Sequence, residues 1–65
     1  MNYKERLLFE LEELIIRIDR LTNWLKTQDE TLNTDLEEEQ LHVMSLYKVI
    51  LKQRIANMMN EGKHE

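Results

Sequence analysis

The chain has 65 residues, with nine basic and thirteen acidic side chains that give a formal net charge of −4. It contains no Cys, which excludes a disulfide scaffold, a thiolate metal site and a cysteine nucleophile. No apolar run approaches the roughly 18 residues that a membrane span needs, and no signal-peptide segment follows the N-terminus. We therefore expect an intracellular protein with no membrane partner. A core of this size contributes only about 3–5 kcal/mol, so we expect oligomerisation to reinforce it.

The first predicted element is a helix over residues 3–26. Asn2 followed by Glu5 is typical of a capping box at a helix start. Apolar residues then recur at spacings of 4, 3, 4, 3 and 4, which is the pattern of a helical seam. The seam consists of Leu7, Leu11, Leu14, Ile18, Leu21 and Leu25. Leu8 and Ile15 widen it into an apolar face.

A loop over residues 27–34 and a second helix over residues 35–60 complete the predicted structure. Thr34 and Glu37 form a second capping-box pattern, and acidic residues crowd the first turn, where the helix dipole favours them. Gly62 stands where a C-terminal cap is expected, and residues 61–65 are predicted to fray. The predicted apolar arc of this helix holds Leu36, Leu41, Val43, Met44, Tyr47, Ile50, Leu51, Ile55 and Met58.

Two helices of about 25 residues joined by a short loop are expected to form an antiparallel hairpin. The predicted fold class is therefore all-α, with one domain over residues 1–65 that assembles into a homo-oligomeric helical bundle. Exposed apolar stripes support the assembly, because an isolated hairpin would leave them uncovered. These stripes contain Phe9 and Ile16 on the first helix and Leu46, Val49 and Ala56 on the second.

Arg54 interrupts the predicted apolar arc of the second helix. A helical wheel places it at the centre of that arc, aligned with Leu36 and close to Tyr47. A guanidinium group in that position needs a partner. One interpretation is an ion pair between the helices with Glu10 or Glu13. The other is an anion site in which Arg54 binds a phosphate and Tyr47 offers an adjacent ring.

Charged and aromatic residues line one border of the apolar face of the first helix. Their spacings of three and four residues allow salt bridges among them, and Arg20 can stack on Trp24. The border is either an ordinary solvated edge or a nucleotide pocket, because guanidinium groups match phosphates and aromatic rings stack on bases. It contains Arg6, Glu10, Glu13, Arg17, Arg20 and Trp24.

Metal binding and catalysis have little support in the sequence. His42 and His64 are isolated, and although Glu38 shares a helix face with His42, two ligands do not make a zinc site. Ser45 lies within a helix without the glycine turn that presents a nucleophile. We expect no metal, no cofactor and no enzymatic activity. The acidic charge balance also argues against binding of long nucleic acids.

A family resemblance rests on residues in both helices. The matching residues are Glu5-Arg6, Glu13-Leu14, Arg17-Ile18, Arg20-Leu21 and Trp24-Leu25, followed by Gln40-Leu41, Met44, Tyr47, Leu51 and Arg54-Ile55. On these residues the chain resembles very small proteins of crAss-like and other tailed phages, similar to the helical hairpin of phage sponges that block CBASS and Thoeris immunity. The family pattern has Lys in place of Arg20 and Phe in place of Trp24, and both substitutions keep the chemistry.

The resemblance implies a homo-oligomer, commonly a hexamer, in the cytoplasm of the infected bacterial host. It implies capture of a cyclic nucleotide signal, without cleavage, in pockets between protomers. The ligand would be a cyclic di- or trinucleotide or a cyclic ADP-ribose isomer. The candidate ligand-binding residues are Tyr3, Arg6, Arg17, Arg20, Trp24, Tyr47 and Arg54. The alternatives are a protein–protein adaptor of phage origin and a purely structural coiled-coil module.

Overall fold

Helix α1 begins and ends where polar side chains satisfy its terminal backbone groups. In the computed structural model, which describes residues 2–61, α1 spans Tyr3–Lys26. The Oδ1 atom of Asn2 accepts a hydrogen bond of 2.8 Å from the backbone N–H of Glu5, as an N-cap residue does. At the other end, the side chains of Thr27 and Gln28 both donate to the backbone carbonyl of Trp24, at 2.8 and 3.0 Å. These bonds add to the bond of 3.1 Å that the Thr27 backbone N–H donates to the same carbonyl at the helix end.

The connector holds its shape through side-chain contacts to its own backbone, and helix α2, which spans Asp35–Glu61, follows it. The carboxylate of Asp29 accepts from the N–H of Thr31 at 3.1 Å, in the manner of an Asx turn. In place of the predicted pairing of Thr34 with Glu37, the Thr34 hydroxyl donates to the Glu38 carboxylate at 3.2 Å. The α2 helix includes Glu61, whereas the predicted cap at Gly62 and the rest of the predicted tail lie outside the described residues.

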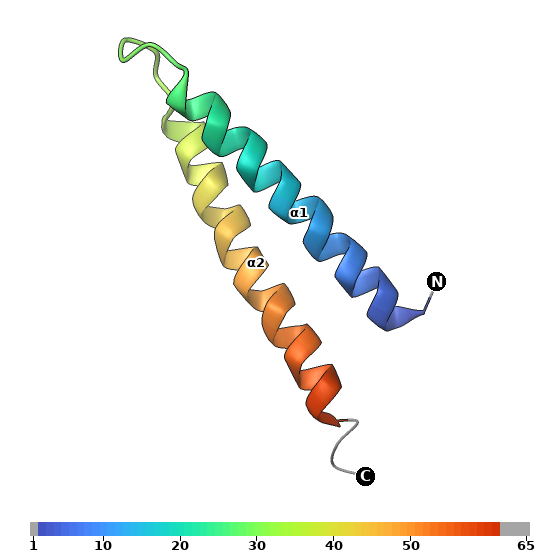
Figure 1. The fold of residues 1–65 in the computed structure, drawn as a ribbon. Coiled ribbons are helices and arrows are strands. Elements are labelled where there is room, and N and C mark those ends of the chain that lie inside the picture. The colour runs from blue at the N-terminus through green and yellow to red at the C-terminus, as the bar shows by residue number, and fades with distance from the viewer. Residues whose placement is uncertain (1, 62–65) are drawn as a thin grey trace.

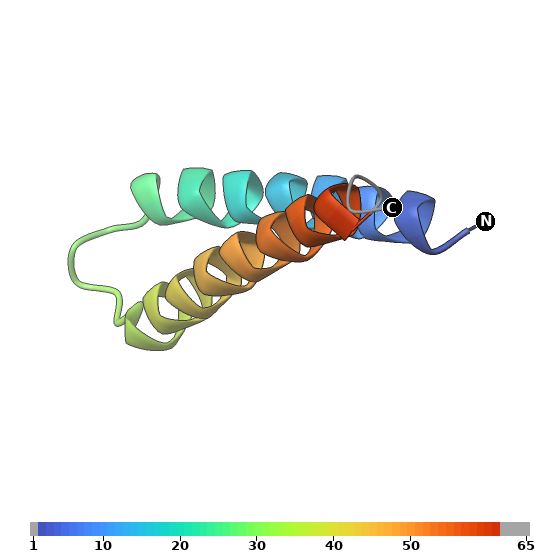
Figure 2. The same cartoon turned by 90° about the horizontal axis from the view of Figure 1, so that it is seen from below.

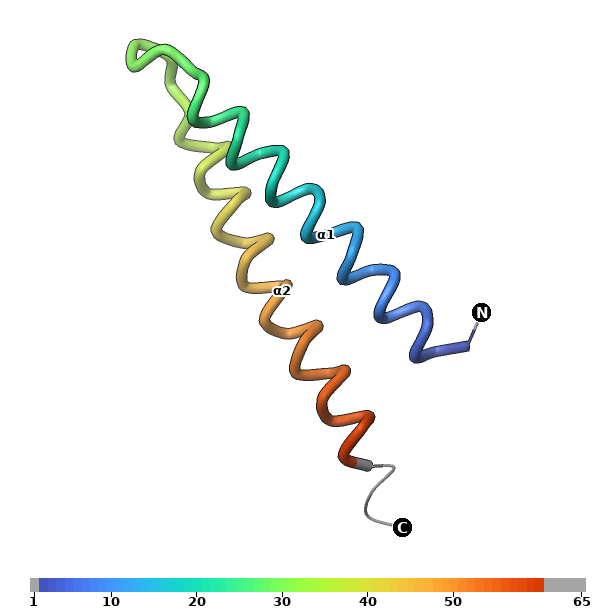
Figure 3. The backbone as a smooth tube through the Cα atoms, in the orientation of Figure 1, coloured from blue at the N-terminus to red at the C-terminus, as the bar shows by residue number. Residues whose placement is uncertain are grey.

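The two helices form an antiparallel hairpin, which confirms the predicted all-α fold (Figure 1). The Cα trace makes the connection at one end of the rod easy to follow (Figure 3). In the view turned by 90°, α2 runs obliquely across α1 (Figure 2). The molecule is elongated, at 56 × 19 × 13 Å along its principal axes. Within residues 2–61, neither helix is long and apolar enough to cross a membrane.

Three leucines form the buried centre of the hairpin: Leu7 and Leu14 of α1 and Leu51 of α2. Partly buried residues surround them, namely Leu11, Ile18, Met44, Tyr47, Ile55 and Met58. Every residue of the predicted α1 seam is at least partly buried, whereas Leu8, which was expected to widen the seam, is exposed.

The predicted apolar arc of α2 is partly wrong. Leu36, Val43 and Ile50 are 77, 59 and 50% exposed, because α2 directs its Met44–Leu51–Met58 line at α1 instead. Val43 and Ile50 directly precede Met44 and Leu51 of the buried line, and Leu36 stands seven positions before Val43. One position turns the side chain by about 100°, which is enough to move it out of the contact.

Candidate functional site

Three depressions line one edge of the hairpin, which we call the groove edge. Six of the seven predicted ligand-binding residues line at least one of them. On a helical wheel the α1 contributors fall within about 140°, so they share one side of that helix. The exception is Arg6, which is exposed and lines none of the three.

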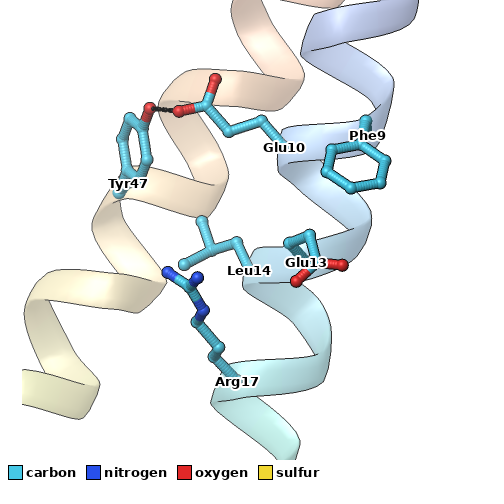
Figure 4. Close-up of a pocket in the computed structure, with 6 residues that line it drawn as sticks. All are labelled: Phe9, Glu10, Glu13, Leu14, Arg17 and Tyr47. Atoms are coloured by element: carbon cyan, nitrogen blue, oxygen red, sulfur yellow. Dashed lines mark hydrogen bonds between the residues drawn. The ribbon is translucent and has the colours of Figure 1, made fainter.

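The middle depression has a volume of about 300 Å³ and contains one of the polar contacts that join the two helices (Figure 4). The hydroxyl of Tyr47 on α2 donates a hydrogen bond to the Glu10 carboxylate on α1. This bond raises the pKa of Tyr47, with smaller contributions from burial and from the charge of Glu10. The phenol therefore stays protonated and donates at neutral pH. The lining consists of Phe9, Glu10, Glu13, Leu14, Arg17 and Tyr47.

The depression nearest the connector is the most cationic of the three. Its volume is about 380 Å³, and it is lined by Arg17, Arg20, Leu21, Trp24, Gln40 and Met44. Arg17 also lines the middle depression, so its side chain lies between the two. Two guanidinium groups beside an indole ring, with no carboxylate in the lining, suit an anion attached to a planar ring.

The third depression, at the end of the hairpin opposite the connector, is built around Arg54. Its volume is about 260 Å³, and its lining is Tyr3, Arg54, Asn57 and Met58. The Nη2 atom of Arg54 donates to the Tyr3 hydroxyl at 2.6 Å, and the guanidinium carbon lies 5.9 Å from the centre of the Tyr3 ring. The hydrogen bond that the guanidinium donates to the Tyr3 hydroxyl is the main cause of a raised pKa at Arg54.

The predicted place of Arg54 at the centre of the packed face is wrong. The side chain is exposed, and its hydrogen bond goes to Tyr3, whereas Glu10 bonds Tyr47. Because Leu51 lies at the centre of the contact, Arg54 is turned about 60° away from it, toward solvent. The guanidinium group is therefore hydrated and keeps donors available.

The groove edge is too long to be one pocket on one hairpin. Tyr3 and Trp24 are 21 positions apart on α1, which corresponds to about 31 Å along the helix axis. The structure accordingly brings together Arg17, Arg20 and Trp24, and separately Tyr3 and Arg54.

Sequence reasoning missed the lining roles of Phe9, Asn57 and Met58. These residues carry no charge and stand in no motif. The missing information was the register of the hairpin, because pairing Tyr47 with Glu10 already places Asn57 and Met58 beside Tyr3. Among residues 2–61, no three His, Asp or Glu side chains are grouped so that they could hold a metal ion.

The fold and its groove edge define a small helical-hairpin protein with cationic and aromatic groups along one edge. The chain belongs to the Sequestin family, whose profile matches residues 1–57. That range includes all seven predicted ligand-binding residues, and the family name indicates sequestration of a partner. This confirms the coarser part of the resemblance, a family of small sequestering proteins. No curated protein and no solved structure matches the chain.

Proposed function

We propose that the protein is a phage sponge that captures a cyclic nucleotide immune signal of its bacterial host and releases it uncleaved. The observation that carries this proposal is the depression in which Arg17 and Arg20 flank Trp24, in a chain of the Sequestin family. Guanidinium groups bind phosphate oxygens through two parallel hydrogen bonds, and an indole ring stacks on a base. A cyclic nucleotide offers both groups in one small molecule.

The charges along the groove edge support different positions for the phosphate and for the base of such a ligand. Phosphate belongs beside Arg17 and Arg20, where no carboxylate lines the surface. The middle depression contains Glu10 and Glu13, which repel phosphate but accept hydrogen bonds from the amino groups of a base. The Tyr47 ring offers a stacking surface there. Arg17, which lines both depressions, would contact the ligand at the junction.

Capture without chemistry is the mechanism that these residues support. The Ser45 hydroxyl already donates to the backbone carbonyl of Leu41 at 2.9 Å within α2, so it is engaged as a helix side chain rather than presented as a nucleophile. A sponge acts stoichiometrically and must bind more tightly than the host effector. We further propose that the protein binds its ligand as a homo-oligomer, such as the hexamer that the family resemblance implies, in the cytoplasm of the infected bacterium.

The test is a thermal-shift and calorimetry panel of cyclic dinucleotides, cyclic trinucleotides and cyclic ADP-ribose isomers. We expect one class to stabilise the protein and to be recovered intact by mass spectrometry. Arg17→Met should then weaken binding by about 2 kcal/mol or more, the scale for a truncated charged contact, which is roughly 30-fold in Kd. Lys52→Met is the matched control, because it removes the same charge from an exposed residue that lines none of the three depressions.

Salt provides an independent check, because binding carried by arginine–phosphate contacts weakens as ionic strength rises. Equal losses of affinity in Arg17→Met and Lys52→Met would mean that Arg17 acts only through the overall charge of the protein. That result would contradict the assignment of the site. Failure of every nucleotide in the panel would overturn the sponge proposal. The protein–protein adaptor would then be the better hypothesis, and a cleaved ligand would indicate an enzyme.

A further inference from the structure

Helix α2 carries a second apolar line about 100° around the helix from the line that contacts α1. We call this line the outer seam, and it consists of Leu36, Val43, Leu46 and Ile50. Their side chains are 77, 59, 52 and 50% exposed, although all four are large aliphatic residues. The spacings of 7, 3 and 4 residues are those of a helix that packs against another helix.

The extent of the outer seam distinguishes it from scattered surface hydrophobic residues. From Leu36 to Ile50 the seam runs for 14 positions, or about 21 Å along α2. Val49, which is 51% exposed, extends it on one side. Single exposed aliphatic residues are ordinary on proteins, but a continuous line of them marks an interaction surface. The partner that fits a straight seam of this spacing is a helix.

The charges that flank the outer seam identify the partner and its direction. Beside the seam, the first turns of α2 carry the acidic residues Asp35 and Glu39, whereas the basic residue Arg54 lies in its second half. Two parallel copies of α2 would bring the acidic residues together. Two antiparallel copies related by an axis near Leu46 place Glu39 of each near Arg54 of the other, and their helix dipoles oppose favourably.

We propose that the outer seam docks antiparallel on the outer seam of a second copy, forming a two-fold dimer centred near Leu46. Such a contact is isologous, because the same surface serves both subunits. A standard interface covers about 800 Å² on each partner, which is roughly one seventh of the 5530 Å² that this hairpin exposes. The proposal identifies the surface and direction of assembly, and it holds whether or not the ligand is a nucleotide.

The two-fold arrangement also completes the groove edge. Gln40, Tyr47 and Arg54 follow the seam residues Leu36, Val43 and Ile50 by four positions each, so they border the seam along one flank. Rotation about an axis near Leu46 brings Gln40 of one copy beside Arg54 of the other. The cationic depression at Gln40 and the Arg54 depression, which are at opposite ends of one hairpin, would then meet across the dimer.

Disulfide trapping tests the direction directly, because the chain has no native cysteine. Leu46→Cys should form a covalent dimer under mild oxidation, since a disulfide needs its two Cα atoms within about 7 Å and this residue is next to the axis. Leu36→Cys should not link to itself, because residue 36 is ten positions from the axis. Its two copies are therefore about 30 Å apart along the helices. Leu32→Cys, exposed in the connector and outside every apolar stripe, controls for random collision.

Sedimentation of the unmodified chain and of Leu46→Glu gives a second measurement that does not depend on oxidation. The unmodified chain should be at least a dimer at micromolar concentration, and Leu46→Glu should reduce its association while keeping its helical circular dichroism. Leu32→Glu should behave like the unmodified chain. Self-linking of Leu36→Cys would overturn the antiparallel direction. A monomeric unmodified chain, or equal trapping of Leu32→Cys and Leu46→Cys, would overturn the proposed surface.

Discussion

Leu51 provides the most direct test of the packing between α1 and α2. It is fully buried, with an exposed fraction of 0%, and Leu7 and Leu14 are the other two buried residues of the core. Leu51→Ala removes three carbon atoms, which at about 0.8 kcal/mol per buried methylene corresponds to a loss of about 2.4 kcal/mol. Measured losses for Leu→Ala substitutions are about 2–5 kcal/mol, and a contact between only two helices can partly collapse, which favours the lower half of that range.

This loss is large compared with what one small core supplies. If the core contributes about 3–5 kcal/mol, Leu51→Ala should leave the hairpin close to its unfolding threshold. At about 4–8 °C per kcal/mol, the Tm should fall by roughly 10–20 °C. Leu32→Ala makes the same change in the connector, where the side chain is 48% exposed, and should cost less than about 0.5 kcal/mol. Equal circular-dichroism melting curves for the two variants would refute the packing of Leu51 against α1.

Two further predictions concern the aromatic and cationic groups of the groove edge. Because the pKa of Tyr47 is raised above 10, its bond to Glu10 should stabilise the fold at neutral pH and be lost only as pH rises through that higher pKa. In a Tyr3→Phe background Tyr47 is the only tyrosine, so an ultraviolet titration with a midpoint at or below 10 would contradict this. Arg54→Met should leave helicity and melting nearly unchanged, because the side chain is exposed, while weakening nucleotide binding; unchanged binding would remove Arg54 from the site.

The α1 face could be predicted from the sequence because its main apolar line has six residues, whereas the second stripe there holds Phe9 and Ile16 alone. Its six seam residues recur without interruption, and the structure buries or partly buries all of them. The helix cap at Asn2 could also be predicted, and its side chain caps the helix as expected. In both cases the deciding interactions lie within one or two turns of the same helix, so the sequence contains the information that is needed.

The α2 face could not be predicted in the same way, because that helix has two apolar lines. Met44–Leu51–Met58 and Leu36–Val43–Ile50 share the same seven-residue spacing, and periodicity alone does not say which of them faces α1. Treating them as one broad arc placed Arg54 at its centre. The choice between the lines depends on how side chains of both helices fit together, which is a property of the pair and not of either helix.

In the candidate site, too, residues of one helix could be grouped from the sequence, whereas contacts between the two helices could not. The arginines and Trp24 on α1 could be grouped from their spacing, since residues three and four positions apart share a helix side. Their partners on α2 depended on the register, which the bond from Tyr47 to Glu10 fixes. Gln40 beside Arg17 and Asn57 beside Tyr3 both follow from that register.

The distance between the two cationic ends limits what one hairpin can bind. Arg17 and Arg20 are separated by about 4.5 Å of helix rise, which suits the phosphates of one small ligand. Tyr3, which holds Arg54, is 14 positions from Arg17, or about 21 Å away, so a small cyclic nucleotide bound beside Trp24 would not reach Arg54 of the same hairpin. If Arg17 and Arg54 contact the same ligand, they must come from different copies. In that case both Arg17→Met and Arg54→Met should lose binding, and one ligand should bind for each pair of cationic ends, one end from each copy. These two results would support a site built across the antiparallel dimer.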